Sequence, residues 1–393
     1  MIKNVKIRLI QFLAFITLLT NLSCDDSSSY DIIIVGGGTS GVVSTIQSSR
    51  RWSKPLLIEE SDCLWGMITS ACVSAMDGNY KLPSGFLKEF RDSLVSYYGH
   101  LDSLKTGWVS NMMFEPSLGN QILKNIANSQ KNLTIKYNSI VEGVQKNESF
   151  IVNLQSGLNY ESKVLIDATE LGDLIPMLNL PYSIGMDSNK KYGEDIAPDV
   201  SNNIIQDLTY VMILKDFHKD MTIDKPKNYD RSEFLCSYST GECPQTDKKL
   251  WSKDKLISYG KLPNNKYMIN WPINGNDYYS NSIEMTAKER LLSYEEAKQK
   301  SLRFLYFVQT EMNYSNLSID YDEYQTKDGF PVIPYHRESR RSEGMVTLTL
   351  NDMKSPYSSN NSIYRTGCAV EAYTVDHHHG AYDNYVKLPR LYF

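Results

Sequence analysis

The sequence has few of the features that mark metal-binding and nucleic-acid-binding proteins. None of its six cysteines are spaced as Cys-x-x-Cys, so the usual patterns of a zinc site or an iron–sulfur cluster are missing. Positive charge is not in excess, because 41 Lys and Arg residues face 46 Asp and Glu residues, for a formal net charge of −5. We therefore expect no bound metal and no nucleic-acid partner.

Long hydrophobic runs are also scarce, and the clearest one stands at the N-terminus. Residues 9–22 are mostly apolar and follow Lys3, Lys6 and Arg8. A membrane span needs about 20 apolar residues, so this shorter run after a basic start predicts a secretory signal over residues 1–24. Cys24 and the polar tether of residues 25–29 resemble the start of a mature bacterial lipoprotein.

An exported protein follows from this N-terminus, either periplasmic or anchored to the membrane as a lipoprotein. Three fates remain open: lipidation of Cys24, simple cleavage, and a retained anchor. Processing at Cys24 would leave five cysteines, and an odd number cannot be fully paired. Cys236 and Cys243 lie in one polar stretch, where they are candidates for a loop disulfide outside the cytosol.

The bulk composition is that of a globular protein. Hydrophobic residues make up 41% and charged residues 22% of 393 residues, which suggests two or three domains. No internal repeat is evident.

The most informative stretch begins with a short apolar strand at residues 31–35. The glycine turn of residues 36–41 (GGGTSG) follows, then a segment of helical length and a second apolar strand at residues 55–58. Gly36 permits a tight turn, Gly38 permits close approach of a diphosphate, and Gly41 lets the helix pack on the strand. The spacing predicts a dinucleotide site.

Two further features complete this dinucleotide pattern. Thr39 and Ser40 open the helix, where unpaired backbone N–H groups attract phosphate. Glu59 stands at the end of the second strand, 23 residues after Gly36, close to the roughly 20 residues expected of the acid that holds a ribose diol. Glu60 is the alternative acid.

Residues 62–69 (DCLWGMIT) and 73–80 (VSAMDGNY) resemble the bacterial FAD-dependent oxidoreductases. The resemblance is to proteins similar to the flavin subunit of heterodisulfide reductase, with a Rossmann domain of the glutathione-reductase type. It implies FAD as the cofactor, with Gly66 and Met67 beside it. Trp65 replaces the first glycine of the family's Gly-Gly pair, so we expect its bulk to hinder close backbone approach.

Residues 133–173 change to a strand pattern of three short runs separated by polar turns. The resemblance implies an antiparallel meander inserted before the chain returns to the parallel sheet, with the backbone of Val141 near the adenine. Residues 167–173 (DATELGD) are similar to the family's second signature, Asp-Ala-Thr-Gly-x-Gly-Asp. It implies Gly172 and Asp173 at the cofactor, while Glu170 replaces a glycine.

Two late motifs supply candidate catalytic residues. Residues 334–341 (PYHRESRR) match the family's Tyr-x-Arg-Glu-Ser-Arg-Arg signature, in which Arg337 and Arg340 are candidates to face an anionic substrate or the flavin. A solvated basic strand end is the alternative. In residues 376–380 (DHHHG), His378 is a candidate proton donor or flavin contact, with an exposed loop or a metal ligand as alternatives.

We therefore expect an α/β fold: a Rossmann-type FAD domain over residues 30–173, an α+β cap domain for substrate over residues 174–330, and a return segment over residues 331–393. The middle region is expected to hold strands at residues 208–214 and 266–271 and a long helix at residues 286–311. The resemblance implies a further strand and helix after the last residue, so we expect a C-terminally incomplete chain with weak FAD binding.

The expected function is an FAD-dependent oxidoreductase that transfers hydride or electrons between a small molecule and flavin. The rival is an exported, non-catalytic remnant that keeps the fold without a competent FAD site. An iron–sulfur cluster is suggested only by the wider family, and no cysteine motif here supports it.

Overall fold

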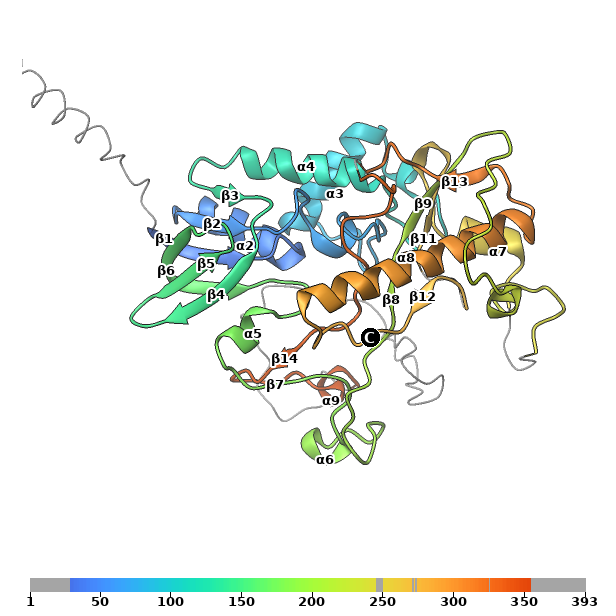
Figure 1. Ribbon diagram of the computed structural model, residues 1–393. Helices are drawn as coiled ribbons and strands as arrows, with labels where there is room; N and C mark the ends of the chain where they lie inside the picture. The colour runs from blue at the N-terminus through green and yellow to red at the C-terminus, as the bar shows by residue number, and fades with distance from the viewer. Residues whose placement is uncertain (1–28, 245–249, 271, 273, 325, 355–393) are drawn as a thin grey trace, which may run out of the picture.

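The computed structural model describes residues 29–244, 250–270, 272, 274–324 and 326–354 (Figure 1). Its largest sheet has six strands in the order β3-β2-β1-β6-β5-β4. The strands are β1 (Ser29–Val35), β2 (Pro55–Ile58), β3 (Thr134–Lys136), β4 (Val141–Lys146), β5 (Phe150–Leu154) and β6 (Asn159–Asp167). Strands β3, β2, β1 and β6 run parallel to one another, whereas β6, β5 and β4 form an antiparallel meander.

The strand register brings the ends of β2, β1 and β6 to one edge of the sheet. Val35 pairs with Ile58 on one side and with Asp167 on the other. The glycine turn, Glu59 and the loop after Asp167 therefore start side by side, as the dinucleotide pattern requires. The expectation of a single strand for the first of the three runs within residues 133–173 is wrong. This run forms two strands: β3, which extends the parallel sheet, and β4, with which the meander begins.

The apolar residues of β1 and β2 are buried on both faces of the sheet, which explains their nearly continuous apolar runs. Helices α2 (Thr39–Arg50), α3 (Gly85–Tyr98) and α4 (Pro116–Asn128) bury one face through residues such as Ile34, Leu57 and Phe90. Figure 1 shows α3 and α4 along this side of the sheet. Ile33 and Leu56 point to the other face and pack with residues of the meander.

The second core is an α+β unit. A four-stranded sheet packs with the long helix α8 (Ala287–Thr310), which begins with a capping box formed by Thr286 and Glu289. Its strands are, in spatial order, β10 (Lys261–Leu262), β11 (Lys266–Ile269), β9 (Met212–Asp216) and β13 (Leu317–Ile319). The expected helix is confirmed. The expected single strand at residues 208–214 is wrong, because Tyr210 and Val211 separate β8 from β9.

The remaining bounds are as follows. The strands are β7 (Tyr182–Ser183), β8 (Leu208–Thr209), β12 (Asp277–Tyr278) and β14 (Arg341–Ser342). The helices are α5 (Leu174–Met177), α6 (Asn189–Tyr192), α7 (Lys253–Ser258) and α9 (Leu350–Lys354). The 3-10 turns are η1 (Gly66–Ile68), η2 (Leu101–Leu104), η3 (Arg231–Phe234) and η4 (Pro263–Asn265).

A buried ionic cluster joins the α+β unit (the cap unit) to the six-stranded sheet and its helices (the first unit). The Lys266 ammonium lies 2.9 Å from the carboxylate of Glu115 at the start of α4 and 2.9 Å from that of Asp320. It also lies 2.5 Å from the carboxylate of Glu323, whose other oxygen accepts from the Ser117 N–H. Buried charges tolerate such a position only when they are paired, so this cluster fixes the two units against each other.

The expected disulfide between Cys236 and Cys243 is present, while Cys63 and Cys72 are buried thiols. Within the part of the chain that the structure describes, no helix is both long and apolar enough to cross a membrane. The signal segment and Cys24 lie outside the described residues.

Candidate functional site

The glycine turn has the geometry that its sequence predicts. Gly36 has a φ of +96°, and a Cβ on it would lie 2.3 Å from the carbonyl oxygen of Ala168. A Cβ on Gly41 would lie 1.9 Å from the carbonyl oxygen of Gly36. Real Cβ atoms do not approach backbone this closely, so the turn needs glycine at both positions.

The N-terminus of α2 is free of side-chain caps. Gly38 is the N-cap residue and forms no side-chain cap hydrogen bond, and the first turn holds no acidic residue. Thr39 and Ser40 are exposed. The first N–H groups of a helix have no intrahelical acceptor, so this end can receive an anion.

Glu59 is buried beside the turn and has three protein donors. One carboxylate oxygen accepts from the Gly37 N–H at 2.5 Å, and the other accepts from the N–H and Oγ of Ser61 at 2.8 and 2.5 Å. The Ser139 N–H donates to the Glu59 carbonyl oxygen, which brings the start of β4 at Val141 toward this acid. Glu59 therefore connects the turn, the end of β2 and the segment just before the meander.

The expectation that Trp65 obstructs the turn is wrong. Trp65 has a left-handed φ of 85°, the conformation that explains why glycine suits this position. Its ring is buried away from the turn, with its centroid 4.4 Å from that of Phe90 and 5.8 Å from that of Phe86. Its N–H donates to the Gly37 carbonyl oxygen at 2.6 Å, so Trp65 supports the turn through its backbone.

Glu170 occupies the space between the two glycine segments. A Cβ on Gly66 would lie 1.9 Å from its Oε1, and one on Gly38 would lie 3.5 Å from the same oxygen. Burial raises the pKa of Glu170 to about 7, helped by the negative charges of Glu59 and Glu60, whereas a hydrogen bond from the Met67 N–H acts in the opposite direction. A carboxyl group that titrates near neutrality therefore lies against the two glycine segments that are predicted to receive a diphosphate.

Asp173 ties the same loop to the cap unit. Its carboxylate accepts two hydrogen bonds from Arg290 of α8, at 2.8 and 3.0 Å, and one from Arg340 at 2.9 Å. Burial alone would raise the pKa of Asp173, but the hydrogen bonds and charges of Arg290 and Arg340 outweigh it and hold the pKa below its usual value. Gly172 precedes it with a φ of +66°.

The two candidate arginines are bound to protein groups. Arg337 donates to the Asp207 carbonyl oxygen, to Thr209 Oγ1 and to the Asp277 carboxylate, at 2.7 to 3.1 Å. Arg340 is buried and donates to the Leu171 carbonyl oxygen in addition to Asp173. These contacts give both arginines a structural role in joining β8, β12 and the Asp173 loop.

Sequence reasoning missed a pair of neutral groups near Asp173. Tyr294 Oη lies 2.9 Å from His336 Nε2. Burial lowers the pKa of His336 to about 3, with help from the positive charges of Arg290 and Arg337, so its imidazole stays neutral near pH 7. The available signal is weak: Arg290 and Tyr294 share one face of α8 by their four-residue spacing, and His336 lies inside the late motif.

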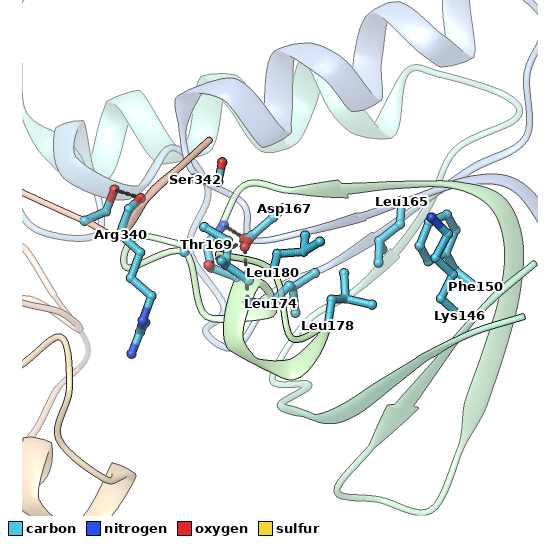
Figure 2. A pocket seen from close by; sticks show the side chains of 13 residues that line it. Lys146, Phe150, Leu165, Asp167, Thr169, Leu174, Leu178, Leu180, Arg340 and Ser342 are labelled. Carbon is cyan, nitrogen blue, oxygen red and sulfur yellow. Dashed lines mark hydrogen bonds between the residues drawn. The ribbon is translucent and has the colours of Figure 1, made fainter. Parts of the chain in front are cut away.

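A cavity of about 440 Å³ lies behind the second signature rather than at the glycine turn. Figure 2 shows Asp167 and Thr169 at one end and Leu165 and Phe150 further along the meander. Arg340 contributes to the lining, while no residue of the glycine turn does. The cavity therefore lies apart from the glycine turn, although Gly172 of the second signature belongs to its lining.

Two further expectations concern His378 and metal binding. His378 lies outside the described residues. Among the residues that are described, no three His, Cys, Asp or Glu side chains are grouped so as to hold a metal ion.

The family model for FAD dependent oxidoreductases matches residues 31–391. None of the curated proteins matches this sequence. Among solved structures, a thioredoxin reductase from Gloeobacter violaceus is 15% identical over 37% of this chain and 38% of its own, with a TM-score of 0.24. L-proline dehydrogenase from P. horikoshii is 18% identical over 36% of this chain and 23% of its own, with a TM-score of 0.24.

A third solved structure, p-nitrophenol 4-monooxygenase from Pseudomonas putida DLL-E4, is 10% identical over 48% of this chain and 49% of its own, with a TM-score of 0.30. Each of these three alignments therefore spans less than half of the other protein's length.

Proposed function

This chain belongs to the FAD-dependent oxidoreductase family, and from that premise we propose that it binds FAD across the glycine turn and transfers a hydride or electrons between a small molecule and the flavin. The observation that carries the proposal is the turn itself. Gly36 and Gly41 permit no side chain, and they place an uncapped helix N-terminus beside a buried acid at the ends of adjacent parallel strands.

The residues present fit FAD at most positions. The N–H groups at the start of α2 would hold the diphosphate, Glu59 would accept from the ribose, and the Gly66–Met67 backbone would lie beside the flavin. FAD, when bound, supplies the hydride-accepting chemistry. The chain supplies placement and a partly buried polar environment. Glu170 is the group that does not fit, because its carboxylate faces the same glycines.

On the cap side, the Tyr294–His336 pair is a proposed site of polar contact with the substrate. Tyr294 Oη and His336 Nε2 share a hydrogen bond between two neutral groups, and the neighbouring Arg290 is joined to the cofactor-side loop through Asp173. Because its pKa is about 3, the His336 imidazole is too weak a base to take a proton near pH 7, so the pair can orient a substrate by hydrogen bonds but does not serve as its general base.

A reconstitution experiment tests the proposal. Purified protein is incubated with FAD and desalted, and flavin content per chain is measured together with reversible bleaching by dithionite. We expect flavin near one per chain in the wild type at mildly acidic pH, and none in Gly36→Val, whose side chain would meet the Ala168 carbonyl. Wild-type protein that retains no flavin at any pH from about 5.5 to 8 would refute FAD binding.

The alternative is an exported protein that keeps the fold without redox activity. The position of Glu170 favours this candidate, because its carboxylate, when ionised, lies against the glycine turn and opposes a diphosphate. The two candidate functions differ in whether a small molecule reduces the bound flavin. In an oxidoreductase, at least one donor from a panel of small alcohols, amines, thiols and reduced nicotinamides should reduce the flavin. In a remnant, none of these donors should reduce it.

Export and lipidation of Cys24 also belong to the proposal and rest on the N-terminal sequence. Cys24→Ser should move the protein from the detergent phase to the aqueous phase. Equal aqueous partitioning of both forms would leave simple cleavage. The finer likeness to the heterodisulfide reductase flavin subunit rests on residues 62–80, 167–173 and 334–341.

A further inference from the structure

We propose that Glu170 determines the affinity of this chain for FAD, because the flavin diphosphate can bind the glycine turn only when the Glu170 carboxylate is protonated or turned away. The inference rests on the proposed function. Its geometric basis is that one oxygen of Glu170 lies against both glycine segments, Gly38 at the start of α2 and Gly66 in η1.

The charges around Glu170 make this carboxylate easy to neutralise. The end of β2 contributes Glu59 and Glu60, whose negative charges both disfavour ionisation of Glu170. The η1 turn contributes the Met67 N–H as a donor, and the first turn of α2 contributes no acid. Among the described residues, no cation is among the groups that shift its pKa.

The charged residues of its own loop are engaged elsewhere. Asp167 accepts from Thr169 and from the Leu174 N–H, while Asp173 is paired with Arg290 and Arg340. Within the described part of the chain, the groups that shift the pKa of Glu170 are therefore one donor and two acidic neighbours, Glu59 and Glu60. With a pKa of about 7, close to neutrality, a modest change in pH changes its charge.

The consequence for FAD binding is a linked proton. The diphosphate of FAD is itself fully ionised across this range, so it repels an ionised Glu170 and tolerates a protonated one. If only the protonated form binds, the competent fraction falls from about nine-tenths at pH 6 to about one-tenth at pH 8. FAD should then bind about tenfold more weakly at pH 8 than at pH 6.

The test is a titration of FAD into wild type, Glu170→Gln, Glu170→Gly and the control Glu148→Gln, followed by quenching of flavin fluorescence at about pH 6, 7 and 8. Gln keeps the size of the side chain without its charge, and Gly empties the cradle. Glu148 is an exposed acid in the turn between β4 and β5, so its loss controls for net charge. Circular dichroism at each pH checks that every variant is folded.

We expect the dissociation constant of wild type and Glu148→Gln to rise about tenfold from pH 6 to pH 8, and that of Glu170→Gln to change less than twofold. Both Glu170 variants should bind at least tenfold more tightly than wild type at pH 8. Wild type and Glu170→Gln with the same profile would overturn the role of Glu170 while leaving FAD binding intact. Absence of binding in all four proteins at every pH would overturn the proposed function as well.

Discussion

Glu59 and Glu170 follow β2 and β6, the two strands that flank β1, and both carboxylates reach the same glycine turn. Glu59 accepts from three protein donors, so its charge is compensated and its position is fixed. Glu170 has the Met67 N–H and acidic neighbours, so its charge is opposed. The comparison teaches that the local supply of donors, rather than proximity to the turn, decides whether an acid supports the site or obstructs it.

The largest effect should come from removing the turn that both acids share. Gly36→Ala would place a Cβ 2.3 Å from the Ala168 carbonyl oxygen at a φ of +96°, so we expect loss of FAD binding and a destabilisation of about 2–4 kcal/mol. Gly157→Ala is the matched control, because Gly157 has a similar φ of +85° but nothing within 4 Å of its Cβ. It should cost about 1–2 kcal/mol and leave FAD binding unchanged.

Urea unfolding and FAD titration of both glycine variants measure this difference. Equal losses of stability and binding would show that backbone conformation, rather than the contact with Ala168, controls the turn.

Substitution of Glu59 alone should have the next largest effect. Glu59→Ala removes the acceptor of the Gly37 N–H and both Ser61 donors, and charge-assisted hydrogen bonds contribute about 1.5–3 kcal/mol each where buried. We expect at least tenfold weaker FAD binding and a lower melting temperature. Ser61→Ala removes one of these donors and should cost only about 1 kcal/mol. Unchanged FAD affinity in Glu59→Ala would assign the ribose to another acid, with Glu60 the first candidate.

The positions of the glycines and of Glu59 were predictable from sequence because they depend on local spacing between strand, turn and helix. The role of Trp65 was not, because its ring direction depends on a core formed with Phe86 and Phe90 of α3. The expectation for Arg337 depended on partners far along the chain, since Asp207 and Asp277 come from the cap unit. Sequence showed that Glu170 was unusual, but only the fold brings Gly38 and Gly66 against it.

Removing the charge of Glu170 should change the free energy of unfolding, which tests the contrast between Glu59 and Glu170. The pKa of Glu170 is raised to about 7 in the folded protein, above its ordinary value, so the folded state holds the proton more tightly. Its contribution to stability is fully present below about pH 4.5 and is lost as pH rises through about 7. Glu170→Gln should therefore be more stable than wild type at pH 8 by about 1–3 kcal/mol, and the difference should shrink toward pH 5.

Thermal unfolding of wild type and Glu170→Gln across this range measures the difference. A gap that grows toward acid pH would mean that the ionised carboxylate is stabilised, against the arrangement described here.

The smallest effect is expected at Glu60, whose negative charge raises the pKa of Glu170 less than burial and the charge of Glu59 do. Glu60→Gln should move the midpoint of the FAD-binding pH profile downward by less than about one pH unit. Fluorescence titrations at closely spaced pH values resolve such a change. A midpoint that stays in place or moves upward would show that the charge of Glu60 does not raise the pKa of Glu170.

The most direct measurement of the central claim is the number of protons taken up when FAD binds. Calorimetric titrations in two buffers of different ionisation enthalpy give this number without reference to activity. At pH 8, where Glu170 is mostly ionised in the free protein, wild type should take up about 0.9 proton per FAD bound, and Glu170→Gln should take up almost none. Equal uptake by the two proteins, or none by either while FAD binds, would contradict the account.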